Sequence, residues 1–153
     1  MKSYRKGVGA LIVNEQDLIF VANRIDMPLA WQMPQGGVDE GESPKEALLR
    51  ELEEEIGTND VVILNQTKDW LRYDFPKDIQ QKMRSLWGDE GCLGQEQIWF
   101  LCKMENVSSI NLKTPHPEFL EFKWLTPDNV LAECVDFKKD LYKNIFIELL
   151  NFY

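Results

Sequence analysis

Three glutamates near the middle of the chain are spaced so that they can act together. Glu54 and Glu55 follow Glu51 by three and four positions. On an α-helix this spacing places all three on one face. Like charges at this spacing repel, and the dipole of a helix disfavours negative charge in its last turns. A divalent cation would turn this repulsion into coordination, because hard cations prefer oxygen ligands. The alternative is a solvated acidic face.

The helix that carries these glutamates has clear start and end signals. Ser43 suits the N-cap, Pro44 the first helical position, and Glu46 can close a capping box. Gly57 suits the end, because glycine tolerates the left-handed backbone just past a helix. We therefore predict a helix over residues 44–56. Its buried side is predicted to consist of Leu48, Leu49, Leu52 and Ile56.

The loop before this helix is suited to a ligand. Residues 35–37 include two glycines that allow close backbone approach, and Gly41 provides a turn. Arg50 lies four positions from both Glu46 and Glu54. We interpret it as the residue that holds the carboxylates in place, the alternative being a simple surface ion pair.

The net charge of −9 restricts the kinds of partner. Residues 36–58 contain eight acidic and two basic residues, so this segment accounts for −6 of the total. No broad basic face is evident, which argues against binding to DNA or to long duplexes of any kind. The end of a single strand or a free nucleotide remains compatible.

The cysteines and the lone histidine exclude several kinds of chemistry. Cys92, Cys102 and Cys134 are odd in number and form no Cys-x-x-Cys pair. This pattern argues against disulfides and a zinc site and suits a protein of the reducing cytosol. His116 stands between two prolines without an evident triad partner, which argues against a serine or cysteine nucleophile. No apolar run approaches ~18 residues, and the first six residues lack an export signal. We expect a soluble, cytoplasmic protein without a membrane partner.

Hydrophobic periodicity predicts an α/β protein. We predict strands over residues 8–13, 18–22, 61–64, 70–73, 95–104 and 119–125, a short helix after Thr126, and a final helix over residues 137–152. Residues 27–35 read as an irregular lead into the acidic helix, after Asn23 and Arg24 at the end of the second strand. Residues 74–94 read as a long connection, of the kind that is usually functional or disordered. Strands interleaved with two substantial helices indicate one domain over residues 1–153, with a mixed sheet covered on both faces.

Residues 36–58 resemble the signature box of the Nudix hydrolases. The pattern consists of Gly36, five residues, Glu42, seven residues, the triplet Arg50-Glu51-Leu52, the pair Glu54-Glu55, and Gly57. The one departure is Thr58, where the family pattern has a bulky aliphatic residue. This resemblance implies a Nudix-type α/β/α sandwich in which the box forms a metal site.

Motifs outside the box extend the resemblance from Tyr4 to about Tyr142. They are Trp31-Gln-x-Pro-Gln-Gly-Gly, Trp70-Leu-Arg-Tyr73 with Pro76, Gly94-Gln-x-Gln-x-Trp-Phe100, Pro117-Glu118-Phe119, Trp124 and Phe137-Lys138-x-Asp-x-Tyr142. Together they are similar to the bacterial RNA pyrophosphohydrolase group, of which dinucleoside polyphosphate hydrolases are close relatives.

The resemblance implies a role for each matching position. The implied metal site contains Glu51, Glu54, Glu55, Glu118 and Gly36. The implied catalytic set is Arg50 with Glu51, Glu54 and Glu55, in which either Glu54 or Glu55 is the general base. The implied substrate contacts are Arg24, Tyr73, Gln95, Phe137 and Lys138. Close relatives have a second basic residue where this chain has Asn23, and residues 76–94 are longer than in some members, so the substrate preference stays open.

The function implied is metal-dependent hydrolysis of a phosphoanhydride, with Mg²⁺ or Mn²⁺ as the metal. The favoured substrate is the 5′-triphosphate end of single-stranded RNA, trimmed to a monophosphate during RNA decay. The alternative is a dinucleoside polyphosphate such as diadenosine tetraphosphate, and a non-catalytic binding module is the least favoured. We expect a monomer.

Overall fold

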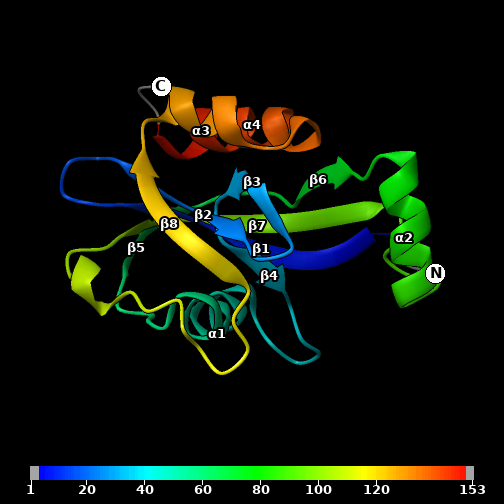
Figure 1. Cartoon of the computed structure of the whole chain (residues 1–153), viewed down its shortest axis with the longest axis horizontal. Helices are drawn as coiled ribbons and strands as arrows, with labels where there is room; N and C mark the ends of the chain where they lie inside the picture. The colour runs from blue at the N-terminus through cyan, green and yellow to red at the C-terminus, as the bar shows by residue number, and fades with distance from the viewer. Residues whose placement is uncertain (1–3, 151–153) are drawn as a thin grey trace.

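A mixed β-sheet runs through the centre of the molecule (Figure 1). The computed structural model describes residues 4–150. The strands in this part of the chain are β1 Tyr4–Val13, β2 Ile19–Arg24, β3 Met27–Gln32, β4 Gln35–Gly37, β5 Val62–Gln66, β6 Leu71–Asp74, β7 Gly94–Lys103 and β8 Phe119–Leu125. The helices are α1 Pro44–Ile56, α2 Lys77–Trp87, α3 Pro127–Glu133 and α4 Lys139–Leu150, with 3-10 turns at Val107–Ser109 and Asp136–Lys138.

The two longest strands form the centre of the sheet. β1 and β7 pair in parallel along their whole length, from Tyr4 opposite Gly94 to Val13 opposite Lys103. The other pairings are antiparallel: β2 pairs with β1, β3 and β8, β4 pairs with β1, and β5 and β6 pair with β7. The sheet is therefore mixed, as the sequence predicts.

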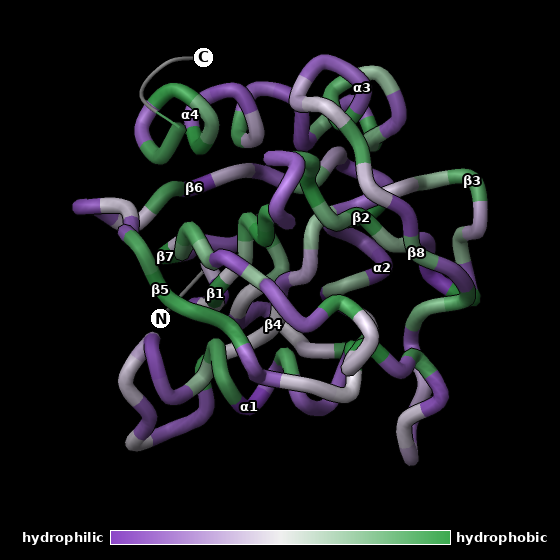
Figure 2. Tube along the Cα trace, turned by 90° about the vertical axis from the view of Figure 1, so that its left-hand side faces the viewer, coloured by the Kyte–Doolittle hydropathy of each residue, from purple (hydrophilic) through white to green (hydrophobic). Residues whose placement is uncertain are grey.

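Helices cover both faces of this sheet. Side chains alternate along β1, so that Ile12 contributes to the core under α1, whereas Leu11 contributes to the core under α4. In Figure 1, α3 and α4 lie above the sheet and α1 below it, and the turned view of Figure 2 shows the same two layers. This is the predicted α/β/α sandwich with a mixed sheet.

Most predicted elements are confirmed. The prediction that the lead into the box and residues 74–94 are irregular is wrong, because both contain regular structure. The helix over residues 44–56 is confirmed, although Leu49 on its predicted buried side is only half-buried. The lead into the box contains β3 and β4, which pair with β2 and β1. Residues 77–87 form α2, because Ile79, Met83 and Trp87 recur every four residues and pack against the core. The final helix begins at Lys139, after a 3-10 turn, and its predicted end at 152 lies outside the described residues.

None of the helices in residues 4–150 is long and apolar enough to span a membrane. The three cysteines are buried and unpaired within the described structure.

One hydrogen bond connects α4 to the strand that leads to the box. The Met33 amide donates to the hydroxyl of Tyr142 over 3.1 Å, and both residues are fully buried. Met33 is two residues before β4, so this contact fixes the position from which β4 begins.

We expect Tyr142→Phe to lower the free energy of unfolding by about 1–3 kcal/mol, because the Met33 amide would be left buried without a partner. Chemical denaturation measures this value. Tyr4→Phe is the matched control, since its hydroxyl donates to Asp74 in an exposed contact, and it should cost no more than roughly 0.5 kcal/mol. Equal, small effects of both substitutions would contradict this role of Tyr142.

Candidate active site

The box helix begins with the predicted capping box. The Glu46 amide donates to Ser43 Oγ over 3.2 Å, and the Ser43 amide donates to Glu46 Oε1 over 3.0 Å. Gly57 ends the helix with a φ of 77°. The Glu46 carboxylate is therefore engaged at the cap, and the carboxylates that Arg50 contacts are others.

Arg50 instead joins the loop before α1 to the helix. Its guanidinium donates to Glu42 through Nε (2.7 Å) and Nη2 (2.9 Å), and Nη2 also donates to the Gly37 carbonyl (2.9 Å). Nη1 donates to Glu51 (2.9 Å) and Glu54 (3.1 Å). The guanidinium lowers the pKa of Glu42 to about 2. Arg50 therefore fixes the loop and two of the box carboxylates relative to one another.

Glu51 and Glu55 come together beneath β4. Glu55 is only 3% exposed, and its Oε2 has no hydrogen-bond partner within the described residues. Burial raises the pKa of Glu55, as do the nearby charges of Glu51 and Glu118, and burial also raises the pKa of Glu51. A Cβ atom at Gly36 would overlap the Glu51 carboxylate, so any larger residue here would displace that carboxylate from its present position. An ionised carboxylate buried without a partner is costly, whereas a cation would compensate its charge.

The other two carboxylates of the predicted metal site are more exposed. The Glu54 side chain is 59% exposed and bonded to Arg50, and Glu118 is exposed in the loop before β8. Within residues 4–150 no three carboxylate, histidine or cysteine side chains lie close enough to hold one cation. The spacing of the glutamates alone did not predict that Glu55 is buried while Glu54 faces outward. The side chains of Glu51 and Glu55 nevertheless fit a hard cation, because they converge on a site that holds an unpartnered carboxylate oxygen.

A cavity of about 430 Å³ opens beside the glutamate pair. It brings together most of the predicted site residues. These are Arg24, Gly36, Glu51, Glu55, Tyr73, Gln95, Glu118, Phe137 and Lys138. Arg50 and Glu54 do not line it, which agrees with their position on the outer side of the box.

Lys138 supplies a buried cation to the cavity. Its Nζ donates to Gln35 Oε1 over 3.2 Å, and Gln35 Nε2 is within 3.3 Å of the Tyr73 hydroxyl. Burial lowers the pKa of Lys138 to about 8, with a smaller contribution from Arg24. Gln35 thus orients both predicted substrate contacts, a role that the sequence analysis missed although Gln35 belongs to a motif it quoted.

An aromatic cluster forms another part of the cavity wall. Phe137 stacks against Tyr73 with a centroid distance of 6.1 Å and an interplanar angle of 26°, and it meets Phe75 edge-on at 6.3 Å. The sequence analysis missed Phe75, because nothing in its spacing distinguishes it from an ordinary core residue. Gln95 Oε1 accepts from Gln97 Nε2 over 2.8 Å. Arg24, 44% exposed, forms an ion pair with Asp26 at 2.9 Å.

Asn23 links β2, which carries Arg24, to β3 and to β8, the strand that follows Glu118. Its Nδ2 donates to the Pro28 carbonyl over 3.0 Å, and its Oδ1 accepts from the Glu121 amide over 2.8 Å. It is 4% exposed, at the point where the register of β2 shifts against both β3 and β8. Asn23 therefore has a structural reason to be polar. The basic residue that close relatives have at this position did not indicate this role.

A family model described as NUDIX domain matches residues 3–145. The chain belongs to the Nudix hydrolase family. The chain is 44% identical to "Nudix hydrolase 26, chloroplastic" of Arabidopsis thaliana over 94% of this chain and 68% of that protein. It is 44% identical to "RNA pyrophosphohydrolase" of Rhodospirillum rubrum over 97% of this chain and 88% of that protein.

Solved structures share the Nudix fold at low sequence identity. The E. coli dihydroneopterin triphosphate pyrophosphohydrolase aligns with a TM-score of 0.69 and 18% identity, over 96% of this chain and 99% of that one. A C. elegans Ap4A hydrolase binary complex aligns with a TM-score of 0.67 and 18% identity, over 96% and 98% of the two chains. At such identities the likeness shows the fold alone. Nudix hydrolases are generally dependent on divalent metals.

We expect Lys138→Met to raise the free energy of unfolding at pH 7 by about 1–3 kcal/mol, because it removes a buried charge. The pKa of Lys138 in the folded protein, about 8, lies below the ordinary 10.5. Between these values the unfolded chain binds more protons, so the wild-type protein becomes more stable as the pH rises. The advantage of the variant should therefore shrink from pH 8 to 10.5.

Denaturant titrations at several pH values measure this difference. Lys139→Met is the control, because Lys139 is paired with Asp136 at the surface. Its effect should stay within roughly 0.5 kcal/mol at every pH. A Lys138→Met protein less stable than wild type at pH 7 would show that the buried ammonium stabilises the fold.

Proposed function

We propose that this Nudix hydrolase cleaves a phosphoanhydride bond of a nucleotide polyphosphate, converting the 5′-triphosphate end of single-stranded RNA to a monophosphate. The observation that carries this proposal is the pair formed by the buried Glu55 and the partly buried Glu51, in the same cavity as Lys138 and Arg24. Carboxylates at one part of the cavity and cations at another suit an anionic chain held next to a metal site. The similarity to chains named "RNA pyrophosphohydrolase" supports the choice of RNA.

The proposed metal site consists of Glu51 and Glu55, with Glu54, Glu118 and the backbone of Gly36 as further ligands, and the proposed metal is Mg²⁺ or Mn²⁺. When bound, such a cation neutralises polyphosphate charge and makes a bound water acidic enough to act as a nucleophile. Arg50 keeps Glu51 and Glu54 in place through its bonds to Glu42 and the Gly37 carbonyl. One of Glu54 and Glu55 accepts the proton of the attacking water.

The proposed recognition of substrate uses the other cavity walls. The Lys138 and Arg24 cations contact phosphate or base groups, and the Phe137 and Tyr73 rings offer a stacking surface for a nucleobase. Gln95 adds an amide for an edge contact. This mode of binding needs an unpaired 5′ end, as expected for single-stranded RNA.

A dinucleoside polyphosphate is the second candidate substrate. The cavity has apolar wall beyond the Phe137–Tyr73 rings, formed by residues of α2, which leaves room for a nucleoside at each end of a polyphosphate chain. A non-catalytic module is disfavoured because every box carboxylate is present. We further propose a cytoplasmic monomer consisting of a single domain over residues 1–153, and the buried free cysteines fit a reducing compartment.

We expect the protein with Mg²⁺ or Mn²⁺ to release pyrophosphate from triphosphorylated RNA and leave a monophosphate end. Glu55→Gln should lower kcat by about 10²-fold or more and abolish the rise in melting temperature that Mn²⁺ causes in the wild type. Parallel incubations with triphosphorylated RNA and diadenosine tetraphosphate, with identification of the products, show which substrate is preferred.

Glu53→Gln is the matched control for this experiment. Glu53 is exposed on the same helix and accepts only from Asn59 at the surface, so both its turnover and its response to Mn²⁺ should match wild type. Wild-type turnover by Glu55→Gln would refute the assignment of the metal site.

We expect Phe137→Ala to raise KM for triphosphorylated RNA by about 5- to 100-fold, because loss of a stacking surface costs about 1–3 kcal/mol per base. The melting-temperature rise with Mn²⁺ should be unchanged, because the Phe137 ring packs against Tyr73 and Phe75 and supplies no ligand to a cation. Steady-state kinetics and thermal unfolding measure the two quantities. A loss of Mn²⁺ binding without a change in KM would count against base stacking at Phe137.

A further inference from the structure

Helix α2 presents an apolar face that the core covers only in part. Ile79, Met83, Leu86 and Trp87 recur at helical spacing on one side, yet no residue of α2 is fully buried. Leu86 is 66% exposed. A helix whose apolar side is only half covered by its own protein offers that side to a ligand.

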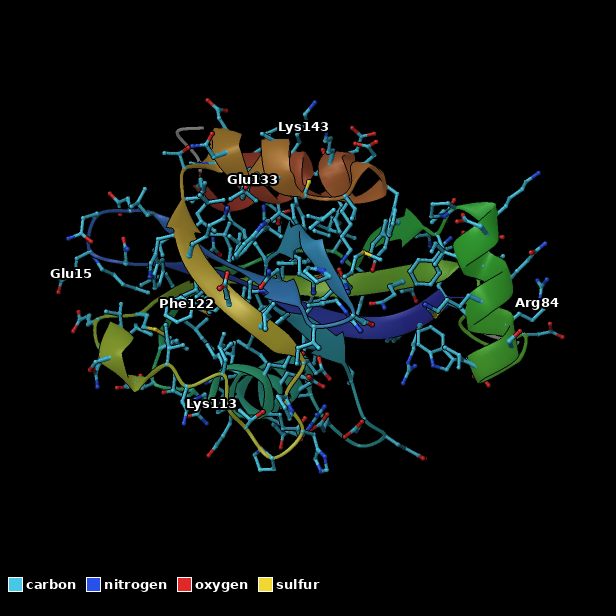
Figure 3. All side chains as sticks on the ribbon, viewed as in Figure 1. Glu15, Arg84, Lys113, Phe122, Glu133 and Lys143 are labelled. Carbon is cyan, nitrogen blue, oxygen red and sulfur yellow. The ribbon has the colours of Figure 1, made fainter. Side chains whose placement is uncertain are left out.

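This apolar face lines the catalytic cavity. Ile79, Met83, Leu86 and Trp87 border the same space as Glu51 and Glu55. Figure 1 shows α2 at the end of the sheet, apart from the helices that cover its two faces. In Figure 3 the labelled Arg84 points outward from α2, away from the sheet. The inner side of α2 is thus a wall of the cavity, and its outer side is polar.

Aromatic and cationic contacts hold this wall in place. The Arg5 guanidinium lies 4.3 Å from the centroid of the Trp87 ring. The ring centroids of Trp87 and Phe75 are 6.5 Å apart. Phe75 in turn contacts Phe137. The apolar wall of α2 is therefore continuous with the aromatic cluster, and it extends that cluster away from the carboxylates.

Lys82 adds a positive charge to the same wall. It is exposed and lines the cavity together with Arg24 at the end of β2 and Asp26 in the β2–β3 turn. The pKa of Asp26 is lowered chiefly by its hydrogen bond with Arg24 and also by the charge of Lys82. Lys82 consequently lies within electrostatic reach of the turn across the cavity. A phosphate passing between α2 and this turn would have cations on both sides.

We propose that α2 binds a second nucleoside of the substrate, with Lys82 beside the phosphate that joins it to the rest. The apolar side chains of Met83 and Leu86 contact the base, beyond the first base at Phe137. This assignment rests on the proposed function, because it extends the path of a nucleotide that begins at the carboxylates. The second nucleoside is either the next nucleotide of an RNA or the far nucleoside of a dinucleoside polyphosphate.

The test compares substrates with one and two nucleosides. ATP carries one, whereas a 5′-triphosphorylated ApG dinucleotide and diadenosine tetraphosphate carry two. The variant Lys82→Gln/Leu86→Asn changes two exposed side chains, and Lys82→Gln alone provides a milder second variant. Ser85→Ala is the control, because Ser85 is exposed on α2, bonded to the Gln81 carbonyl and outside the cavity lining. KM is measured for hydrolysis, and dissociation constants are measured by calorimetry in metal-free buffer.

For the double variant we expect KM and Kd to rise by about 5- to 20-fold for at least one two-nucleoside compound, with less than about a 2-fold change for ATP. A rise in KM and Kd for the dinucleotide alone identifies the ligand of α2 as the next nucleotide of an RNA. A rise for diadenosine tetraphosphate alone identifies it as the far nucleoside of a dinucleoside polyphosphate. Equal changes for all three compounds, or none, would overturn the proposal. If the wild type hydrolysed none of them, the proposed function would fail, while the Kd ratios would still decide the role of α2.

Discussion

Glu51 and Glu55 interact where β4 passes over α1, and a Cβ atom at Gly36 would overlap the Glu51 carboxylate. Two carboxyl groups placed this closely, one of them almost fully buried and the other partly, favour protonation or a cation. The surrounding structure resists their separation: the capping box fixes the start of α1, and Arg50 ties the preceding loop to the helix. Buried repulsion between two carboxylates, held by a rigid frame, is thus the feature that makes this site suited to a divalent metal.

The charge distribution around the cavity follows from the same frame. The chain carries a net −9, yet the cavity that the glutamates line is also lined by the cations Arg24, Lys138 and Lys82. The fold accepts the burial of Lys138, whose pKa falls to about 8, by bonding its ammonium to Gln35. A stabilising apolar residue could fill this position, so the buried lysine is best explained by the anion it would meet.

Local signals made α1 predictable from the sequence. Ser43, Pro44, Glu46 and Gly57 each act within a few residues of the helix ends, so their meaning does not depend on the rest of the fold. Which glutamate is buried depends on where β4 passes, and that is a long-range contact that spacing does not encode. The same holds for Asn23, whose two hydrogen bonds reach β3 and β8. Helix α2 was missed because its apolar residues are few and set among polar ones, in a segment that opens with Pro76 and ends near glycines.

The central claim is that Glu51 and Glu55 form the core of a divalent cation site. The most direct test is an anomalous difference map from crystals of the protein grown with Mn²⁺, collected with and without a nonhydrolysable nucleoside triphosphate. The account predicts a peak in contact with the carboxylates of Glu51 and Glu55 beside Gly36. Full occupancy of Mn²⁺ elsewhere, with no peak at this pair in either crystal, would contradict it.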